Sequence, residues 1–329
     1  MHLNHITSPF PSLEEIAVKM DGPIPEGPED LIPGFMPKQG QLVISGETNV
    51  GKTLAAIETI SSLITGTPLW GQLQPTKRIG KVLYVLGEHY PEVVQRLLLK
   101  TKLPVNNQVF LLGPEQLGYD KWFVAKGQPN LQAIDKFKRW AEGCDLVVFD
   151  PLSAFCIGAE VEQDNVTMRL VLDSMSLIAQ HANASCLVLA HQGKPLMDHQ
   201  GKEHTRKSYA IRGASGIEDA ATNIFYMGKS ESTDPSQRVA DGLIYEMRQR
   251  KYKGNAPDSY RLLRNPETLT HTLLGNKPYA DVLKIAAQAK VARLQAFNPQ
   301  IGYRTAIDIV AAIDGVSSET LKRHLGVVQ

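Results

Sequence analysis

A phosphate-binding loop is the clearest chemical signal in the chain. Four residues separate its first glycine from a Gly-Lys-Thr triplet, and the loop lies between a predicted strand and a predicted helix. Backbone N–H groups of such a loop surround phosphate oxygens, and the helix N-terminus favours negative charge. A glycine-rich turn that matches by chance is the alternative, but the strand and the helix favour a nucleotide site. The predicted nucleotide-binding residues are Gly46, Glu47, Thr48, Asn49, Val50, Gly51, Lys52, Thr53 and Leu54.

Two residues of this loop have expected roles in the chemistry. Lys52 is expected to reach the β- and γ-phosphates, and the Thr53 hydroxyl is expected to hold Mg²⁺. Asp150 follows the apolar run 146–149, which is the Walker B pattern, and its carboxylate would orient Mg²⁺ or a water bound to it. A strand-ending aspartate that caps the next turn is the alternative for Asp150.

Three more polar residues follow predicted strands. Glu88 comes after the strand 82–86 and Gly87, and His191 and Gln192 come after the strand 186–190. The carboxyl ends of such strands face the ligand crevice, where a carboxylate can polarise the attacking water. Gly-Glu at a strand end is a weak signal on its own, and His191 is equally compatible with a satisfied histidine at a sheet edge.

Three arginines are candidates for a contact with a neighbouring subunit's nucleotide. Arg248 and Arg250 belong to a segment, 247–253, that holds four cations, and Arg212 precedes a Gly-Ala-Ser run. A guanidinium at the γ-phosphate stabilises charge in the transition state. The alternative is a solvated cationic strand end that blocks aggregation. The polar segment 194–207 is a candidate for contacts with a nucleic-acid backbone, or a solvated loop.

Composition limits the classes of protein that the chain can represent. Its 329 residues, 43% hydrophobic and 21% charged, are ordinary for a soluble globular protein. We find no apolar run near the about 20 residues that span a bilayer and no signal-peptide pattern, so we expect a cytoplasmic protein with no membrane partner. The net charge of +1 means that any contact with DNA is local or depends on an oligomer that concentrates basic loops.

The order of predicted elements indicates an α/β fold with a mainly parallel sheet flanked by helices. We expect an N-terminal arm over residues 1–30, an ATPase domain over 31–270 and a C-terminal helical module over 271–329. Two helices of that module, joined by a turn and with Ser317 as a cap, resemble a helix-turn-helix that either contacts DNA or only packs. Predicted strands are 41–45, 81–86, 108–112, 145–149, 185–190, 223–227, 242–248 and 260–263; predicted helices are 12–20, 54–60, 91–102, 131–142, 165–182, 279–296, 304–313 and 317–324.

Together these motifs resemble the RecA-like P-loop ATPases of the hexameric replicative helicase group, especially plasmid RepA-type helicases and their AAA-like relatives. The resemblance covers roughly residues 30–265, and the ordered set of motifs is more specific than the phosphate loop alone. The segments that carry it are 31–34, 46–53, 68–71, 81–88, 146–152, 187–194 and 211–217.

The resemblance implies roles that the residues alone leave open. Glu88 becomes the general base, and His191 with Gln192 becomes the sensor of the γ-phosphate, although His-Gln replaces the two histidines that the family often has. Arg212 is similar to the RepA-type arginine finger, whereas Arg248 and Arg250 resemble a DnaB-type pair, and all three remain candidates.

For the whole protein, the resemblance implies a helicase from a plasmid, phage or other mobile element that acts as a hexameric ring around single-stranded DNA. The expected cofactors are ATP and Mg²⁺, with ATP bound between subunits. Two alternatives remain: a RecA-like DNA-binding ATPase that loads or remodels without unwinding, and an ATP-driven assembly switch that binds no nucleic acid.

Overall fold

The computed structural model describes most of the chain from residue 29 onward. Gln192, Arg212 and the expected helix 12–20 lie outside the described residues, as does most of the segment 194–207. The described ranges are 29–105, 107–118, 121–125, 127–156, 165–191, 196–197, 203–204, 214–229, 243–251, 259–265, 267–275 and 279–327.

A nine-stranded sheet forms the centre of the molecule, in the order β13-β12-β11-β10-β1-β7-β6-β2-β3. Strands β10, β1, β7, β6, β2 and β3 pair in parallel, and the remaining strands extend the sheet antiparallel from β10. The bounds are β1 Gln41–Gly46, β2 Val82–Leu86, β3 Val109–Leu112, β6 Leu146–Asp150, β7 Ser185–His191, β10 Asn223–Lys229, β11 Ile244–Lys251, β12 Ser259–Arg264 and β13 His271–Leu273.

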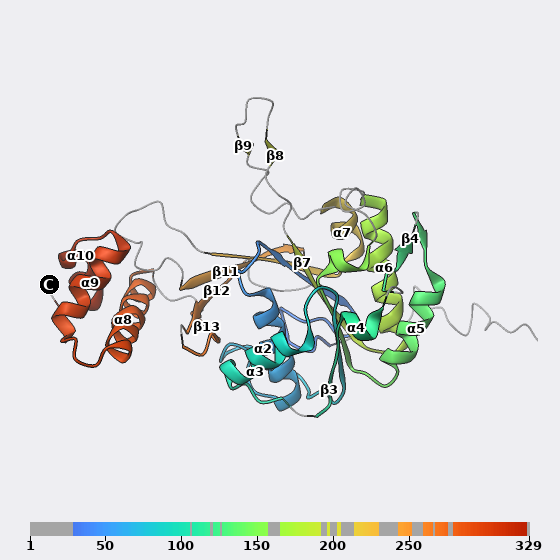
Figure 1. The fold of residues 1–329 in the computed structure, drawn as a ribbon, viewed down its shortest axis with the longest axis horizontal. Coiled ribbons are helices and arrows are strands. Elements are labelled where there is room, and N and C mark those ends of the chain that lie inside the picture. The colour runs from blue at the N-terminus through green and yellow to red at the C-terminus, as the bar shows by residue number, and fades with distance from the viewer. Residues whose placement is uncertain are drawn as a thin grey trace, which may run out of the picture.

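Helices cover both faces of the parallel part of the sheet, as Figure 1 shows. Leu42 and Ile44 of β1 pack in one hydrophobic core with residues of α2, whereas Val43 between them packs in a second core with residues of α5 and α6. This alternation explains why the parallel strands are apolar at nearly every position. The helices are α2 Lys52–Thr65 and α3 Pro91–Thr101 on the first face, and α5 Leu131–Ala141, α6 Asn165–His181 and α7 Ala214–Ala220 on the second.

Short elements connect these layers. Helix α4 and the 3-10 helix η1 follow β3 and β6 respectively, and two small hairpins lie outside the main sheet. The bounds are α4 Pro114–Leu117, η1 Leu152–Phe155, β4 Val124–Ala125, β5 Gln128–Pro129, β8 Leu196–Met197 and β9 Glu203–His204.

Three C-terminal helices form a third core at one end of the molecule (Figure 1). They are α8 (Tyr279–Phe297), α9 (Tyr303–Asp314) and α10 (Ser318–Leu325). Their buried residues pack with Leu243 and Ile244 at the start of β11 and with Leu274 just after β13. The module is therefore joined to the antiparallel edge of the sheet through shared hydrophobic contacts.

The expected α/β class and mainly parallel sheet are confirmed, with differences at the ends of elements. Helix α2 begins at Lys52 rather than at residue 54, and β13 continues the sheet beyond residue 270, where we expected the ATPase domain to end. Ser317 caps α10 as expected, because its Oγ accepts a hydrogen bond from the Thr320 backbone N–H at 3.0 Å. Within the described residues, every helix is too short or too polar to cross a membrane.

Candidate nucleotide-binding site

The phosphate loop leaves the sheet at the carboxyl end of β1, between β7 and β10. At two positions of the loop, the backbone leaves no room or no allowed conformation for a side chain, so glycine is needed there. Gly51 has a φ of 104°, which L side chains rarely adopt. A Cβ on Gly46 would lie 2.2 Å from the Met227 carbonyl oxygen on the neighbouring strand. The loop can therefore approach β10 closely and turn directly into α2.

Lys52 folds back over this loop. Its Nζ donates to the backbone oxygens of Gly46 at 3.0 Å and Glu47 at 2.8 Å, and the residue is buried. Burial lowers the pKa of Lys52 to about 8, an effect that the charges of Asp150, Glu47 and Glu88 partly offset. An anionic phosphate at this position would stabilise the ammonium form, so the loop is electrostatically prepared for an anion.

Asp150 links the loop to the adjacent strands. Its Oδ2 accepts hydrogen bonds from Thr53 Oγ1 at 2.9 Å and from the buried Tyr84 hydroxyl at 2.8 Å. Burial raises the pKa of Asp150, while the hydrogen bonds from Tyr84 and Thr53 act in the opposite direction. Hydroxyl and carboxylate oxygens are the donors that Mg²⁺ prefers, and it usually takes only one or two from protein. The pair Thr53–Asp150 fits that requirement.

The described residues hold no group of three or more histidine, cysteine, aspartate or glutamate side chains suited to a metal. A cation at Thr53 and Asp150 would therefore need ligands from water and from a bound phosphate, which is how Mg²⁺ is usually held in nucleotide sites.

Glu88 and His191 meet across the carboxyl edge of the sheet, after β2 and at the end of β7. Their Oε2 and Nε2 atoms are 3.9 Å apart, and Ser153 Oγ donates to Glu88 Oε1 at 3.3 Å. The interaction with His191 is the main cause that lowers the pKa of Glu88, so its carboxylate is ionised at neutral pH. The Nδ1 atom of His191 is buried and has no hydrogen-bond partner among the described residues.

Lys52, Thr53, Asp150 and His191 all line one cavity of about 370 Å³. Residues predicted from the sequence supply most of the loop side of its wall, and the opposite side includes residues that sequence reasoning missed. The lining residues are Thr48, Asn49, Gly51, Lys52, Thr53, Leu54, His89, Leu97, Asp150, Pro151, His191, Arg264 and Leu269.

The other predicted loop residues, Gly46, Glu47 and Val50, are not among the lining residues that the structure describes. The carbonyls of Gly46 and Glu47 hold Lys52, and the Val50 side chain is buried. Glu88 itself is not among the lining residues that the structure describes; the next residue, His89, is.

Three residues near the site were not predicted: Tyr84, His89 and Arg264. They differ in whether the sequence around them offered a signal. Tyr84 was a polar hydroxyl inside a predicted apolar strand, and His89 directly follows Glu88, so both offered a local signal. Arg264 offered none, because it enters the site from a strand more than 200 positions away and its partner in the loop is the backbone oxygen of Val50.

The two described arginine candidates lie away from their own chain's cavity. Arg248 donates from Nε to Glu246 Oε2 at 2.7 Å, and Arg250 donates from Nε to Glu218 Oε1 at 2.8 Å. Strand β11 runs antiparallel to β10, so Arg250 lies toward the edge of the sheet opposite to the phosphate loop. Neither residue lines the cavity in the described part of the chain.

Comparison with known proteins agrees with this geometry. Residues 8–197 match the family model described as AAA domain. The chain belongs to this AAA-domain family. The part matched includes the phosphate loop, Glu88, Asp150 and His191.

The chain has a RecA-like P-loop fold, which the similarity to the ATPase domain of G40P supports. The ATPase domain of G40P matches with a TM-score of 0.51 and 12% identity, over 75% of this chain and 92% of that one. A KaiC-like protein, PH0186 from Pyrococcus horikoshii OT3, matches with a TM-score of 0.45 and 13% identity, over 74% and 93%. No curated protein sequence matches the chain significantly.

Proposed function

We propose that the protein is a Mg²⁺-dependent ATPase that acts as a ring on single-stranded DNA and unwinds duplex DNA, as a helicase of a plasmid, phage or other mobile element. The observation that carries the ATPase part is the convergence of Lys52, Thr53 and Asp150 on one cavity, with the Glu88–His191 pair at its edge. The match to the ATPase domain of G40P supports the same fold. The DNA-dependent part rests on the ordered motifs in the sequence.

In this proposal, the loop and the start of α2 bind the phosphates. No described side chain caps that helix start, which leaves its first N–H groups directed at the ligand. Lys52 would place its ammonium group against the β- and γ-phosphates, and Thr53 with Asp150 would hold Mg²⁺. The bound Mg²⁺ would neutralise charge on the phosphate oxygens.

Glu88 would accept a proton from the attacking water. Its carboxylate is ionised at neutral pH and is oriented by contacts with His191 and Ser153 on two sides. His191 ends β7 and lines the cavity, so it can report the state of the γ-phosphate to the segment that follows it. Gln192 would share this sensor role.

The hydrolysis step is tested by Glu88→Gln, with Glu92→Gln as the matched control. Glu92 lies in the exposed first turn of α3, so its substitution changes the charge nearby without touching the cavity. We expect Glu88→Gln to lower kcat by about 100-fold or more, the usual contribution of a general base, while ATP still binds. Full activity in Glu88→Gln would show that another group activates the water.

The ring is tested by mixing two inactive variants. An arginine that acts on the neighbouring subunit would be Arg248, Arg250 or Arg212. Suppose that Arg248→Ala or Arg250→Ala is inactive because the neighbouring subunit's site lacks its arginine. Mixing that variant with Glu88→Gln should then restore activity, because some interfaces combine the intact Glu88 of the arginine variant with the intact arginine of the Glu88→Gln subunit. Mixtures that never exceed the activity of their components would contradict a finger acting between subunits.

The two alternatives predict different results. A DNA-binding ATPase that only loads or remodels would show hydrolysis stimulated by single-stranded DNA but no strand displacement. An assembly switch would show hydrolysis that DNA does not change. A fluorescence strand-displacement assay with a forked duplex separates the helicase from the loader.

A further inference from the structure

Arg264 connects the phosphate loop to the antiparallel part of the sheet. It is the last residue of β12, and each side of its guanidinium has a partner. Nη2 donates to the backbone oxygen of Val50 in the loop, Nη1 donates to the Tyr245 hydroxyl at 2.7 Å, and Nε donates to His271 Nε2 at 3.2 Å. The group also stacks on the Tyr245 ring, 3.8 Å from the ring centre. Its orientation is therefore fixed.

The contact with His271 also fixes the tautomer of that ring. Since an arginine Nε only donates, His271 Nε2 must accept, and the ring proton is on Nδ1. Nδ1 lies 2.7 Å from Glu58 Oε2, which therefore accepts from it. The imidazole therefore accepts a hydrogen bond from Arg264 and donates one to Glu58.

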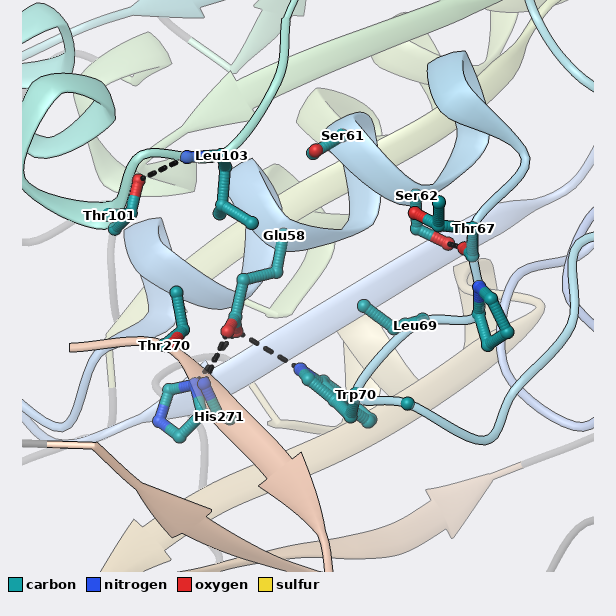
Figure 2. Close-up of a pocket in the computed structure, with 12 residues that line it drawn as sticks. Glu58, Ser61, Ser62, Thr67, Leu69, Trp70, Thr101, Leu103, Thr270 and His271 are labelled. Carbon is teal, nitrogen blue, oxygen red and sulfur yellow. Dashed lines mark hydrogen bonds and ion pairs between the residues drawn. The ribbon is translucent and has the colours of Figure 1, made fainter. Parts of the chain in front are cut away.

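Glu58 is the last member of this series of hydrogen bonds, and Figure 2 shows its bonds to His271 and Trp70. Its carboxylate also accepts hydrogen bonds from the His271 backbone N–H and from Trp70 Nε1, the latter at 3.0 Å. The side chain of His271 is fully buried and that of Glu58 is 5% exposed. A buried network in which every member is paired holds a single geometry.

This series of hydrogen bonds begins at the phosphate loop and ends on the helix that follows the loop. Glu58 lies on α2, the helix that begins at the phosphate loop, and Arg264 contacts the loop just before that helix. The approach is close: a Cβ on Gly51 would lie 2.0 Å from Arg264 Nη2. The loop and its helix are thus held at two points by the same two strands, β12 and β13.

We infer that Arg264 is a positioning residue for nucleotide binding: it holds the Val50 carbonyl so that the following N–H groups face the phosphates, and the buried Glu58–His271 pair holds Arg264. This inference rests on the proposed function, because it requires that the loop bind a nucleotide. It assigns to β12 and β13 a role in the affinity of the site within one subunit, separate from any arginine supplied by a neighbour.

The test compares the wild type with Arg264→Lys, which keeps the charge but loses the fork that bonds three partners at once. Arg261→Lys is the matched control, because it lies on the same strand and its side chain is on the opposite face. Binding of ATP and of tripolyphosphate is measured by titration calorimetry, and KM and kcat are measured in a hydrolysis assay.

We expect Arg264→Lys to raise the Kd of both ligands and the KM for ATP by about tenfold, the scale of one charge-assisted hydrogen bond, with kcat changed less than about twofold. Arg261→Lys should bind like the wild type. His271→Gln should weaken binding less, and combining it with Arg264→Lys should add little, because His271 acts through Arg264.

Two results would overturn the inference while leaving the ATPase proposal intact. One is an Arg264→Lys variant that binds both ligands as tightly as the wild type. The other is a loss confined to ATP, with tripolyphosphate unchanged, because Arg264 would then contact the base or ribose rather than hold the loop. A wild-type protein that binds neither ligand would instead refute the proposed function, and the inference with it.

Discussion

We predict that the buried side chain of Lys52 makes the free energy of unfolding of the nucleotide-free protein depend on pH. Replacing Lys52 by a neutral residue should remove this part of the pH dependence. Burial lowers the pKa of Lys52 from its ordinary value of 10.5 to about 8, and the residue is 7% exposed. Between these two pKa values the unfolded chain keeps the lysine proton while the folded protein has released it. Stability therefore rises with pH through this range, and it falls as pH drops through 8.

The size of the effect follows from the two pKa values. Between about pH 7 and about pH 9.5, the linkage relation gives a gain of about 2 kcal/mol for the folded state. Lys52→Met keeps a chain of similar length and cannot titrate. Every other ionisable group is present in both proteins, so the contributions of groups that do not interact with Lys52 cancel in the difference.

The assay is urea unfolding of the wild type and Lys52→Met in nucleotide-free buffer at both pH values. We expect the free energy of unfolding of the wild type to rise by about 2 kcal/mol relative to the variant over this interval. A difference between the two proteins that stays constant with pH would refute the reasoning, because it would mean that the folded protein holds the Lys52 proton as tightly as the unfolded chain does.

Two further predictions concern the residues around Lys52. Tyr84→Phe removes a hydrogen bond that favours the ionised form of Asp150, so the acid limb of the pH–rate profile should move to higher pH; an unchanged limb would argue against a role for this bond. Gly46→Ala places a methyl group against a backbone carbonyl and should lower the thermal midpoint and abolish nucleotide binding, measured by differential scanning fluorimetry with and without ATP. Gly302→Ala is the control, because a Cβ there meets no atom within 4 Å, and equal losses in both variants would contradict the steric argument.

The parallel half of the sheet could be predicted because its strands carry their own signal. Strands buried on both faces are apolar at consecutive positions, and such runs stand out against the helices between them. Helix α7 gave no such signal, since Gly216 lies inside it and glycine disfavours helices. The structure explains that glycine: a Cβ there would lie 2.0 Å from the Asn165 carbonyl oxygen of α6. Packing between the two helices therefore overrides local preference.

The same distinction applies to the site. Lys52 and Thr53 belong to one continuous motif, and Asp150 ends a recognisable strand, so the sequence contains their arrangement almost directly. The contribution of Arg264 depends on how far the antiparallel strands extend the sheet and on a bond to a backbone oxygen. Backbone partners carry no sequence signal, which is why this side of the cavity was not predicted.

The central claim is that ATP hydrolysis at this cavity is coupled to single-stranded DNA. The most direct test is the steady-state rate of ATP hydrolysis by the wild type and by Glu88→Gln, each with and without single-stranded DNA and in the presence of Mg²⁺. We predict that DNA strongly stimulates the wild-type rate and that Glu88→Gln abolishes hydrolysis under both conditions. A wild-type rate that DNA leaves unchanged would contradict the claim and favour an ATP-driven assembly switch.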